Sequence, residues 1–241
     1  MDVSEASISA LTDKVWPLVE AWPNRSLASV YALVYLDAIS VQLRREGRLE
    51  RTAVYIALGV DLEGRQDALG HWVGDGAGRW GLKHNARQPW WRPHRPGAKF
   101  WMNVLGELQA RGVRDILIAC LDGLTGFSDA LRSVFPKTVI QRCIVHQIRN
   151  SLKYVLYKDQ DAVLRDLKAI DKAPSPDQAE TALLKLRENW SDQDAVALRS
   201  WENNWAELSS FFNFPPEFRR LIYTNTGMES YNRKAAQGRQ K

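Results

Sequence analysis

Near its start, the chain places apolar residues at spacings of three and four, which predicts a helix over residues 4–22 with a serine cap. Three apolar runs follow over residues 30–39, 53–60 and 67–73, and each is long enough for a strand. Only short glycine-containing gaps separate these runs. We therefore expect consecutive strands to pair antiparallel, as a meander.

The pattern then alternates between helix and strand. It predicts helices over residues 99–111 and 127–134, and strands over residues 115–121 and near 138–145. The resulting order is β-β-β-α-β-α-β-α, which indicates an α/β fold. In this layout the first and fourth strands are natural neighbours.

Helical periodicity dominates from residue 151 to residue 212, with a break at the prolines of 174–176. We interpret this segment as a helical subdomain. Its tryptophan-rich stripe is more typical of a core than of a base-stacking surface; the stripe consists of Ala195, Leu198, Trp201, Trp205, Leu208 and Phe212. A last helix is expected over residues 216–234.

Three acidic residues stand where packing alone does not explain them. Asp37 ends the apolar run 30–36, Asp122 ends the run 116–121, and on a last helix Glu229 falls on the face of Phe218 and Ile222. A carboxylate drawn toward the interior needs compensation, and a divalent cation is the usual compensator. The competing interpretation is that an acid after a strand forms a turn.

Neighbouring first and fourth strands would bring Asp37 and Asp122 side by side, whereas Glu229 would have to arrive from the last helix. Carboxylate oxygens suit magnesium, which is commonly held by one or two protein carboxylates together with substrate phosphates. Two such ions can activate a water or a 3′-hydroxyl and stabilise a leaving oxygen. The acids therefore indicate phosphodiester cleavage and transfer.

Composition sets outer limits for the 241-residue chain. No apolar stretch approaches the length of a membrane span and the start lacks an export signal, so we expect a cytoplasmic protein. Cys120 and Cys143 are too few for a disulfide framework and are expected to be reduced. The net charge of +5 permits a polyanionic partner without proving one.

Positive charge concentrates between Asp75 and Glu107, where no acidic residue occurs. Arg79, Arg87 and Arg92 are interleaved there with tryptophans, so cations could contact phosphates while indoles stack on bases. An equally good interpretation is a surface insertion without a role in binding.

Several longer motifs resemble one family in order, from the first helix to about Arg233. They are Val34-Tyr-Leu-Asp-Ala-Ile39, Tyr55-Ile-Ala-Leu-Gly-Val60, Ile118-Ala-Cys-Leu-Asp-Gly-Leu124, the segment from Arg142 to Lys153, Phe214-Pro-Pro-Glu-Phe-Arg-Arg220 and Met228-Glu-Ser-Tyr-Asn-Arg233. On these motifs the chain resembles the bacterial Mutator-type insertion-sequence transposases, which are Asp-Asp-Glu transposases.

The resemblance implies a ribonuclease H-like mixed sheet with an all-helical insertion before the last catalytic helix. It implies Asp37, Asp122 and Glu229 as the catalytic, metal-holding triad, with two Mg²⁺ ions for which Mn²⁺ substitutes. Its partners would be double-stranded DNA, namely the element's terminal inverted repeats and a target, and further copies of the chain. The implied divisions are an N-terminal helix (1–24), a core (25–150), the helical insertion (151–214) and a final helix with its tail (215–241).

Cys143 and His146 are similar to the family's Cys-x-x-His motif near the active centre. Alone they are two ligands short of a tetrahedral zinc site, so support of the active centre or DNA positioning is favoured over metal binding. Arg149 and Lys153 lie about one helical turn apart beyond His146 and could meet phosphates; a solvated face is the other interpretation.

The chain also departs from the family pattern. Residues 77–96 have no counterpart in it and are interpreted as a loop insertion, and both ends lack regions that the resemblance leads us to expect. The first helix resembles a remnant of the family's N-terminal DNA-binding region. A second hypothesis therefore stays open, namely a catalytically inactive fragment that binds DNA or a full-length transposase.

Overall fold

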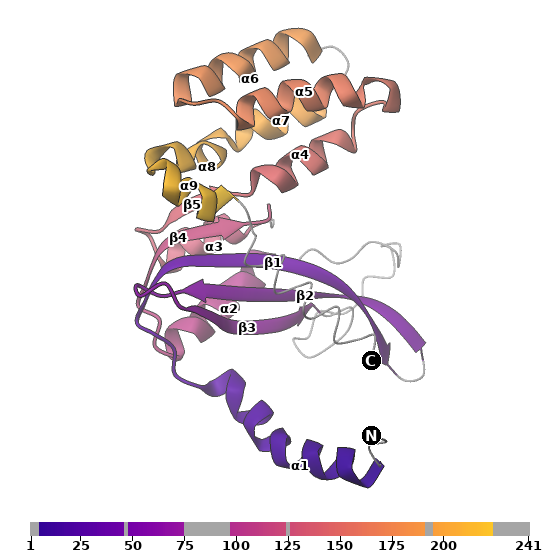
Figure 1. Cartoon of the computed structure of the whole chain (residues 1–241), viewed down its shortest axis with the longest axis vertical. Helices are drawn as coiled ribbons and strands as arrows, with labels where there is room; N and C mark the ends of the chain where they lie inside the picture. The colour runs from indigo at the N-terminus through magenta and orange to yellow at the C-terminus, as the bar shows by residue number, and fades with distance from the viewer. Residues whose placement is uncertain (1–4, 46–47, 75–96, 124–125, 191–194, 224–241) are drawn as a thin grey trace.

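The protein, described here from a computed structural model, is built on a five-stranded mixed sheet of order β3-β2-β1-β4-β5 (Figure 1). The structure describes residues 5–45, 48–74, 97–123, 126–190 and 195–223. The strands are β1 (Val30–Arg45), β2 (Arg48–Val60), β3 (Gln66–Gly74), β4 (Asp115–Leu121) and β5 (Val139–Arg142). The predicted α/β fold is confirmed, and the sheet is mixed as expected.

Strand pairing also follows the expectation from the sequence. β1, β2 and β3 pair antiparallel, and β4 lies parallel to β1 on its other side, followed by β5. The meander and the neighbouring first and fourth strands are therefore both confirmed. The strands are preceded by α1 (Glu5–Ala21) and η1 (Trp22–Asn24). They are joined and followed by α2 (Ala98–Ala110), α3 (Phe127–Val134), α4 (Ile144–Leu152), η2 (Tyr157–Asp159), α5 (Gln160–Asp171), α6 (Pro176–Trp190), α7 (Ala195–Asn203), α8 (Trp205–Leu208), η3 (Ser210–Asn213) and α9 (Pro216–Tyr223).

Three strand predictions were wrong in their bounds, and one of them is the strand predicted over 53–60, which begins at Arg48. The strand expected near 138–145 ends at Arg142, because Cys143 caps α4 and the apolar residues that follow belong to that helix. The first strand runs beyond 30–39 to Arg45, since its pairing with β2 continues after its pairing with β4 has stopped at Leu36. Asp37 therefore lies within a strand and not at its end.

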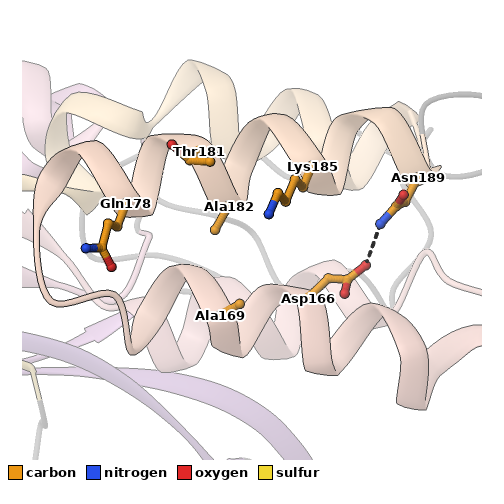
Figure 2. A pocket seen from close by; sticks show the side chains of 7 residues that line it. All are labelled: Asp166, Ala169, Gln178, Thr181, Ala182, Lys185 and Asn189. Carbon is orange, nitrogen blue, oxygen red and sulfur yellow. Dashed lines mark hydrogen bonds between the residues drawn. The ribbon is translucent and has the colours of Figure 1, made fainter.

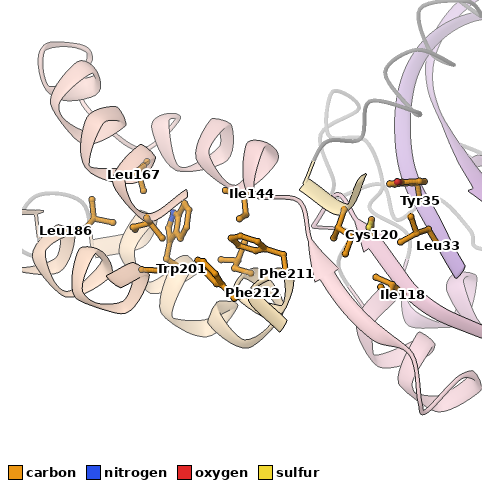
Figure 3. Close-up of a cluster of buried hydrophobic side chains, with 14 of the residues drawn as sticks. Leu33, Tyr35, Ile118, Cys120, Ile144, Leu167, Leu186, Trp201, Phe211 and Phe212 are labelled. Atoms are coloured by element: carbon orange, nitrogen blue, oxygen red, sulfur yellow. The ribbon is translucent and has the colours of Figure 1, made fainter. Parts of the chain in front are cut away.

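Helices cover both faces of the sheet, and each face has its own core. On one face α2 and α3 pack Trp101, Leu105 and Phe127 against the strands, with the Trp101 and Phe127 ring centroids 4.7 Å apart. On the other face, residues of β1 and β4 continue into the core of the helical segment, where Trp201 is fully buried (Figure 3). This second face carries the candidate site.

The helical segment follows the predicted pattern, including the break between α5 and α6 at residues 174–176. Leu198, Trp201 and Leu208 are buried, so the tryptophan-rich stripe contributes to a core as interpreted from the sequence. Of the last expected helix, 216–234, the described part is α9; the remainder lies outside the described residues. No helix among the described residues is long and apolar enough to cross a membrane.

Candidate metal centre

Asp37 and Asp122 are brought together by the parallel pairing of β1 with β4. The pairing ends with Leu36 opposite Leu121, so the next residue of each chain segment is one of the two acids. Side chains alternate across a strand, which places Asp37 on the face of Tyr35 and Asp122 on the face of Cys120. Both belong to the face covered by the helical segment.

His146 joins the pair from the first turn of α4. The backbone N–H of Cys143 donates to the carbonyl of Leu121 at 2.8 Å, which fixes the start of α4 beside the end of β4. The Nδ1 atom of His146 then lies 2.8 Å from Oδ1 of Asp122 and 3.2 Å from Sγ of Cys143. The Cys-x-x-His spacing thus directs the imidazole onto the second acid.

One ligand atom from each of Asp37, Asp122 and His146 lies within 4.8 Å of the other two. The two carboxyl groups offer the oxygen donors that magnesium prefers, whereas an imidazole nitrogen suits softer metals. Because Nδ1 of His146 is bonded to Asp122, this histidine fits the role of orienting a carboxylate ligand better than that of a ligand. The residues present therefore fit a divalent cation held by carboxylates.

Asp37 and Asp122 lie close together where Asp37 is buried, so each carboxylate is affected by the charge of the other. Asp37 is 8% exposed, and its burial together with the negative charge of Asp122 raises its pKa from 3.8 to about 6. The backbone N–H of Ala38 donates to Oδ1 of Asp37 at 2.8 Å and opposes this shift. Additional positive charge at this place would stabilise both carboxylates.

His146 supplies part of that positive charge. Its hydrogen bond with Asp122, followed by its contact with Cys143, raises the pKa of the imidazole from 6.5 to about 10. At neutral pH the cluster then holds an imidazolium against the carboxylate of Asp122, which leaves a net negative charge when both acids are ionised. Such a cluster attracts a cation.

The other residues predicted for the site fall into two groups. Arg149 and Lys153 are exposed at the end of α4, on the side of the helix that carries His146, and Nζ of Lys153 donates to Asn150 Oδ1 at 2.7 Å. The remaining predicted residues lie outside the described part of the chain; they are Glu229, Arg79, Arg87 and Arg92. Cys120 and Cys143 are free and buried.

Sequence reasoning missed two sets of contacts around the acids. The hydroxyl of Tyr35, two residues before Asp37, donates to the carbonyl of Leu221 in α9 at 2.7 Å. Arg142, at the end of β5, donates from Nη2 to Glu207 Oε2 of α8 at 2.6 Å. Neither pair has a local signal, because the partners are far apart in the sequence.

A separate cavity of about 370 Å³ lies between α5 and α6 (Figure 2). Its lining mixes polar and apolar surface and includes Asp166, which accepts hydrogen bonds from Asn189 and from the indole of Trp190. None of the acidic pair or His146 lines it. The cavity is therefore a feature of the helical segment and not of the candidate metal centre.

Comparison with known proteins adds a family to this geometry. The structure is a mixed α/β fold in which two carboxylates meet at neighbouring parallel strands. This arrangement is a candidate site for a divalent cation. The chain matches the family described as "Transposase, Mutator family" over residues 1–83 and 90–240. The chain belongs to this family of transposases. Between residues 1 and 240 only 84–89 are unmatched, so the prediction that the whole segment 77–96 has no counterpart in the family was wrong for residues 77–83 and 90–96.

Individual relatives agree with this assignment. The chain is 42% identical over 97% of its length to a probable transposase for insertion sequence element ISRM3-like of Sinorhizobium fredii. It is 41% identical, again over 97% of its length, to the transposase for insertion sequence element ISRM3 of Rhizobium meliloti. A probable insertion-sequence transposase of Corynebacterium diphtheriae is 34% identical over 99% of the chain and 65% of its own length. The chain spans 54% of the length of the first two relatives.

Proposed function

We propose that the chain forms a ribonuclease H-like catalytic core of a transposase that cleaves DNA at an insertion sequence's inverted repeats and transfers the strand. The observation that carries this proposal is the convergence of Asp37 and Asp122 on adjacent parallel strands, with His146 bonded to the second acid. Membership of the Mutator transposase family supports the same reaction class.

In this proposal Asp37, Asp122 and Glu229 are the catalytic acids and hold two Mg²⁺ ions, for which Mn²⁺ substitutes. Bound there, the ions supply an activated water or 3′-hydroxyl and neutralise the leaving oxygen. Asp37 and Asp122 provide oxygen ligands from a rigid sheet. His146 holds Asp122 in one orientation, and Cys143 supports the histidine.

Double-stranded DNA, both the inverted repeats and the target, is the proposed partner, and the active form is proposed to be a homo-oligomer. Arg149 and Lys153 extend along α4 from His146 and are placed to meet phosphates. The basic residues Arg79, Arg87 and Arg92 would add phosphate contacts from outside the described part of the chain.

A strand-transfer assay with Mg²⁺ and DNA carrying the element's ends tests the proposal. We expect Asp37→Asn, Asp122→Asn and Glu229→Gln each to reduce joining by about a hundredfold or more, since each removes a ligand of the cation. Asp161→Asn, which changes an exposed acid on α5, is the matched control and should retain activity. Joining by folded Asp37→Asn protein at the wild-type rate would refute the assignment.

A second candidate function is the alternative that the sequence analysis leaves open. In this alternative the chain is catalytically inactive and binds DNA or a full-length transposase. Mixing it with the full-length Rhizobium meliloti relative distinguishes the two. Inhibition of that relative, together with absence of joining by the chain alone, would favour the alternative.

A further inference from the structure

The end of α4 exposes an unusual group of large side chains. Tyr154 and Leu156 are each 62% exposed and Tyr157 is 91% exposed, all within the short connection from α4 to α5. Aromatic rings normally bury most of their area in a fold. The two tyrosines, Tyr154 and Tyr157, instead stand in solvent and are available to a partner.

Positive charge surrounds this pair of rings. Arg149, Lys153 and Lys158 are exposed on the same stretch, and no acidic residue occurs from Cys143 to Lys158. The next acids along the chain are Asp159 and Asp161, at the start of α5. Exposed aromatic rings with interspersed cations fit a nucleic acid, because the cations complement phosphates while the rings offer a surface to bases.

The basic face of α4 connects these tyrosines to the candidate metal centre. His146, Asn150 and Lys153 follow one another at helical spacing on one side of α4. The opposite side is anchored in the helical core, where the indole of Trp201 donates to Ser151 Oγ at 2.9 Å. From His146 to its end at Leu152, α4 rises about 9 Å, a span of only a few nucleotides, and Tyr154 follows two residues later.

We infer that Tyr154 and Tyr157 stack on unpaired bases of a DNA strand whose phosphates are held by Arg149, Lys153 and Lys158, beside the candidate metal centre. This inference rests on the proposed function and specifies its substrate as DNA that is locally unpaired next to the cleavage point. Stacking needs no particular base, since every base has a π face. The surface would therefore recognise the opened state of the strand and not its sequence.

Binding measured by fluorescence anisotropy, without divalent cations, tests the inference on the 241-residue chain. The two probes are a labelled blunt duplex and the same duplex with a short unpaired 3′ overhang. Wild-type protein should bind the overhang DNA more tightly. The double variant Tyr154→Ala/Tyr157→Ala should lose about tenfold on the overhang DNA and little on the duplex, whereas Tyr154→Phe/Tyr157→Phe should keep the preference.

Two further variants separate stacking from charge and from general surface effects. Arg149→Ala/Lys153→Ala should weaken binding to both probes and reduce the salt dependence. Leu184→Ala, which changes a side chain that is 58% exposed on α6, should change neither affinity.

The outcomes that overturn the inference are distinct from those that overturn the proposed function. Equal wild-type affinity for both probes, or equal losses in the alanine and phenylalanine variants, would overturn the stacking role and leave the transposase proposal standing. Absence of binding to either DNA would count against both. A change in molar mass by light scattering on tyrosine substitution, with DNA affinity unchanged, would assign the surface to a protein contact instead.

Discussion

Burial of the Asp37 side chain and the negative charge of the Asp122 carboxylate both oppose the ionisation of Asp37. A side chain that is 8% exposed and ionised beside a second carboxylate destabilises the folded state unless positive charge is supplied. His146 supplies some of it through its bond with Asp122. These residues therefore serve the proposed chemistry at a cost to stability, which can be measured without any activity assay.

Asp37→Asn should raise the free energy of unfolding at neutral pH in the absence of divalent cations. The raised pKa of Asp37, about 6, means that the folded chain retains a proton that the unfolded chain releases above pH 3.8, so stability falls as the pH rises through this window. The free energy of unfolding of the variant should exceed that of wild type by close to zero below pH 4 and by on the order of 2 kcal/mol at pH 7. Urea unfolding at both pH values measures it.

Asp161→Asn serves as the control for this experiment, because its exposed carboxylate should give a small difference at either pH. An Asp37→Asn protein that is less stable than wild type at pH 7 would show that this carboxylate is not electrostatically unfavourable.

His146 should remain protonated at pH 8 in the cation-free protein. Its pKa is raised to about 10 by the bond with Asp122, so its contribution to stability is complete below pH 6.5 and is lost as the pH rises toward 10. An NMR titration of the ring measures the pKa directly, and Asp122→Asn should move it back toward 6.5. A wild-type midpoint near 6.5 would rule out the ion pair.

Among the helices and strands, β1 and α9 are joined by a hydrogen bond two residues from Asp37. The Tyr35 hydroxyl bonds to the Leu221 carbonyl near the end of α9, while Ile222 of the same helix is buried in the core. Since Tyr35 and Asp37 lie on one face of β1, this bond holds α9 over the face that carries the candidate metal centre.

Tyr35→Phe should cost about 1 kcal/mol of stability, because one buried hydrogen bond is lost while the ring packing is kept. Hydrogen exchange should accelerate in α9 and stay unchanged in α2. The matched variant is Tyr31→Phe, which removes a hydroxyl that accepts from the Ala28 N–H on the other face. If Tyr31→Phe accelerated α9 as much as Tyr35→Phe does, the bond to Leu221 would not be what holds this helix.

Across the molecule, Glu207 makes ionic contacts that join α8 of the helical segment to β5 and α3 of the sheet region. It lies on α8 and accepts from Arg142 of β5 and from Arg132 of α3, at 2.6 and 2.7 Å. Burial alone would raise the pKa of Glu207, but the hydrogen bonds and charges of these arginines hold it below its usual value. The contact therefore fixes α8 beside the end of β5, close to where α4 begins.

Glu207→Ala should destabilise the chain by about 3 kcal/mol, because it leaves the largely buried guanidinium of Arg142 without its partner. Glu202→Ala is the matched control, since Glu202 pairs with Arg187 on an exposed surface and should cost less than about 1 kcal/mol. Thermal or urea unfolding compares the two. If both variants lost a similar amount of unfolding free energy, the Glu207 contact would stabilise the chain no more than an exposed ion pair does.

Much of the fold was predictable because its signals are local. The apolar run 115–121 and the helix 127–134 have the bounds that their periodicity indicates, since each buries one continuous set of side chains. The strand predicted near 138–145 was wrong after Arg142, because β-branched residues at a strand end and at a helix start look alike in a single sequence. The first helical backbone bond, from the N–H of Gln147 to the carbonyl of Cys143, marks the change.

The sequence by itself determined the order of elements, the acidic residues that interrupt or end apolar runs, and the likeness to a transposase family. Tertiary structure decided which of these residues meet. Asp37 and Asp122 converge because β1 and β4 pair in one particular parallel register, and a shift by one residue would send one carboxylate to the opposite face. His146, Glu207 and Tyr35 acquire their partners only after the chain has folded, because hydrogen bonds and ion pairs depend on distance in space and not along the sequence.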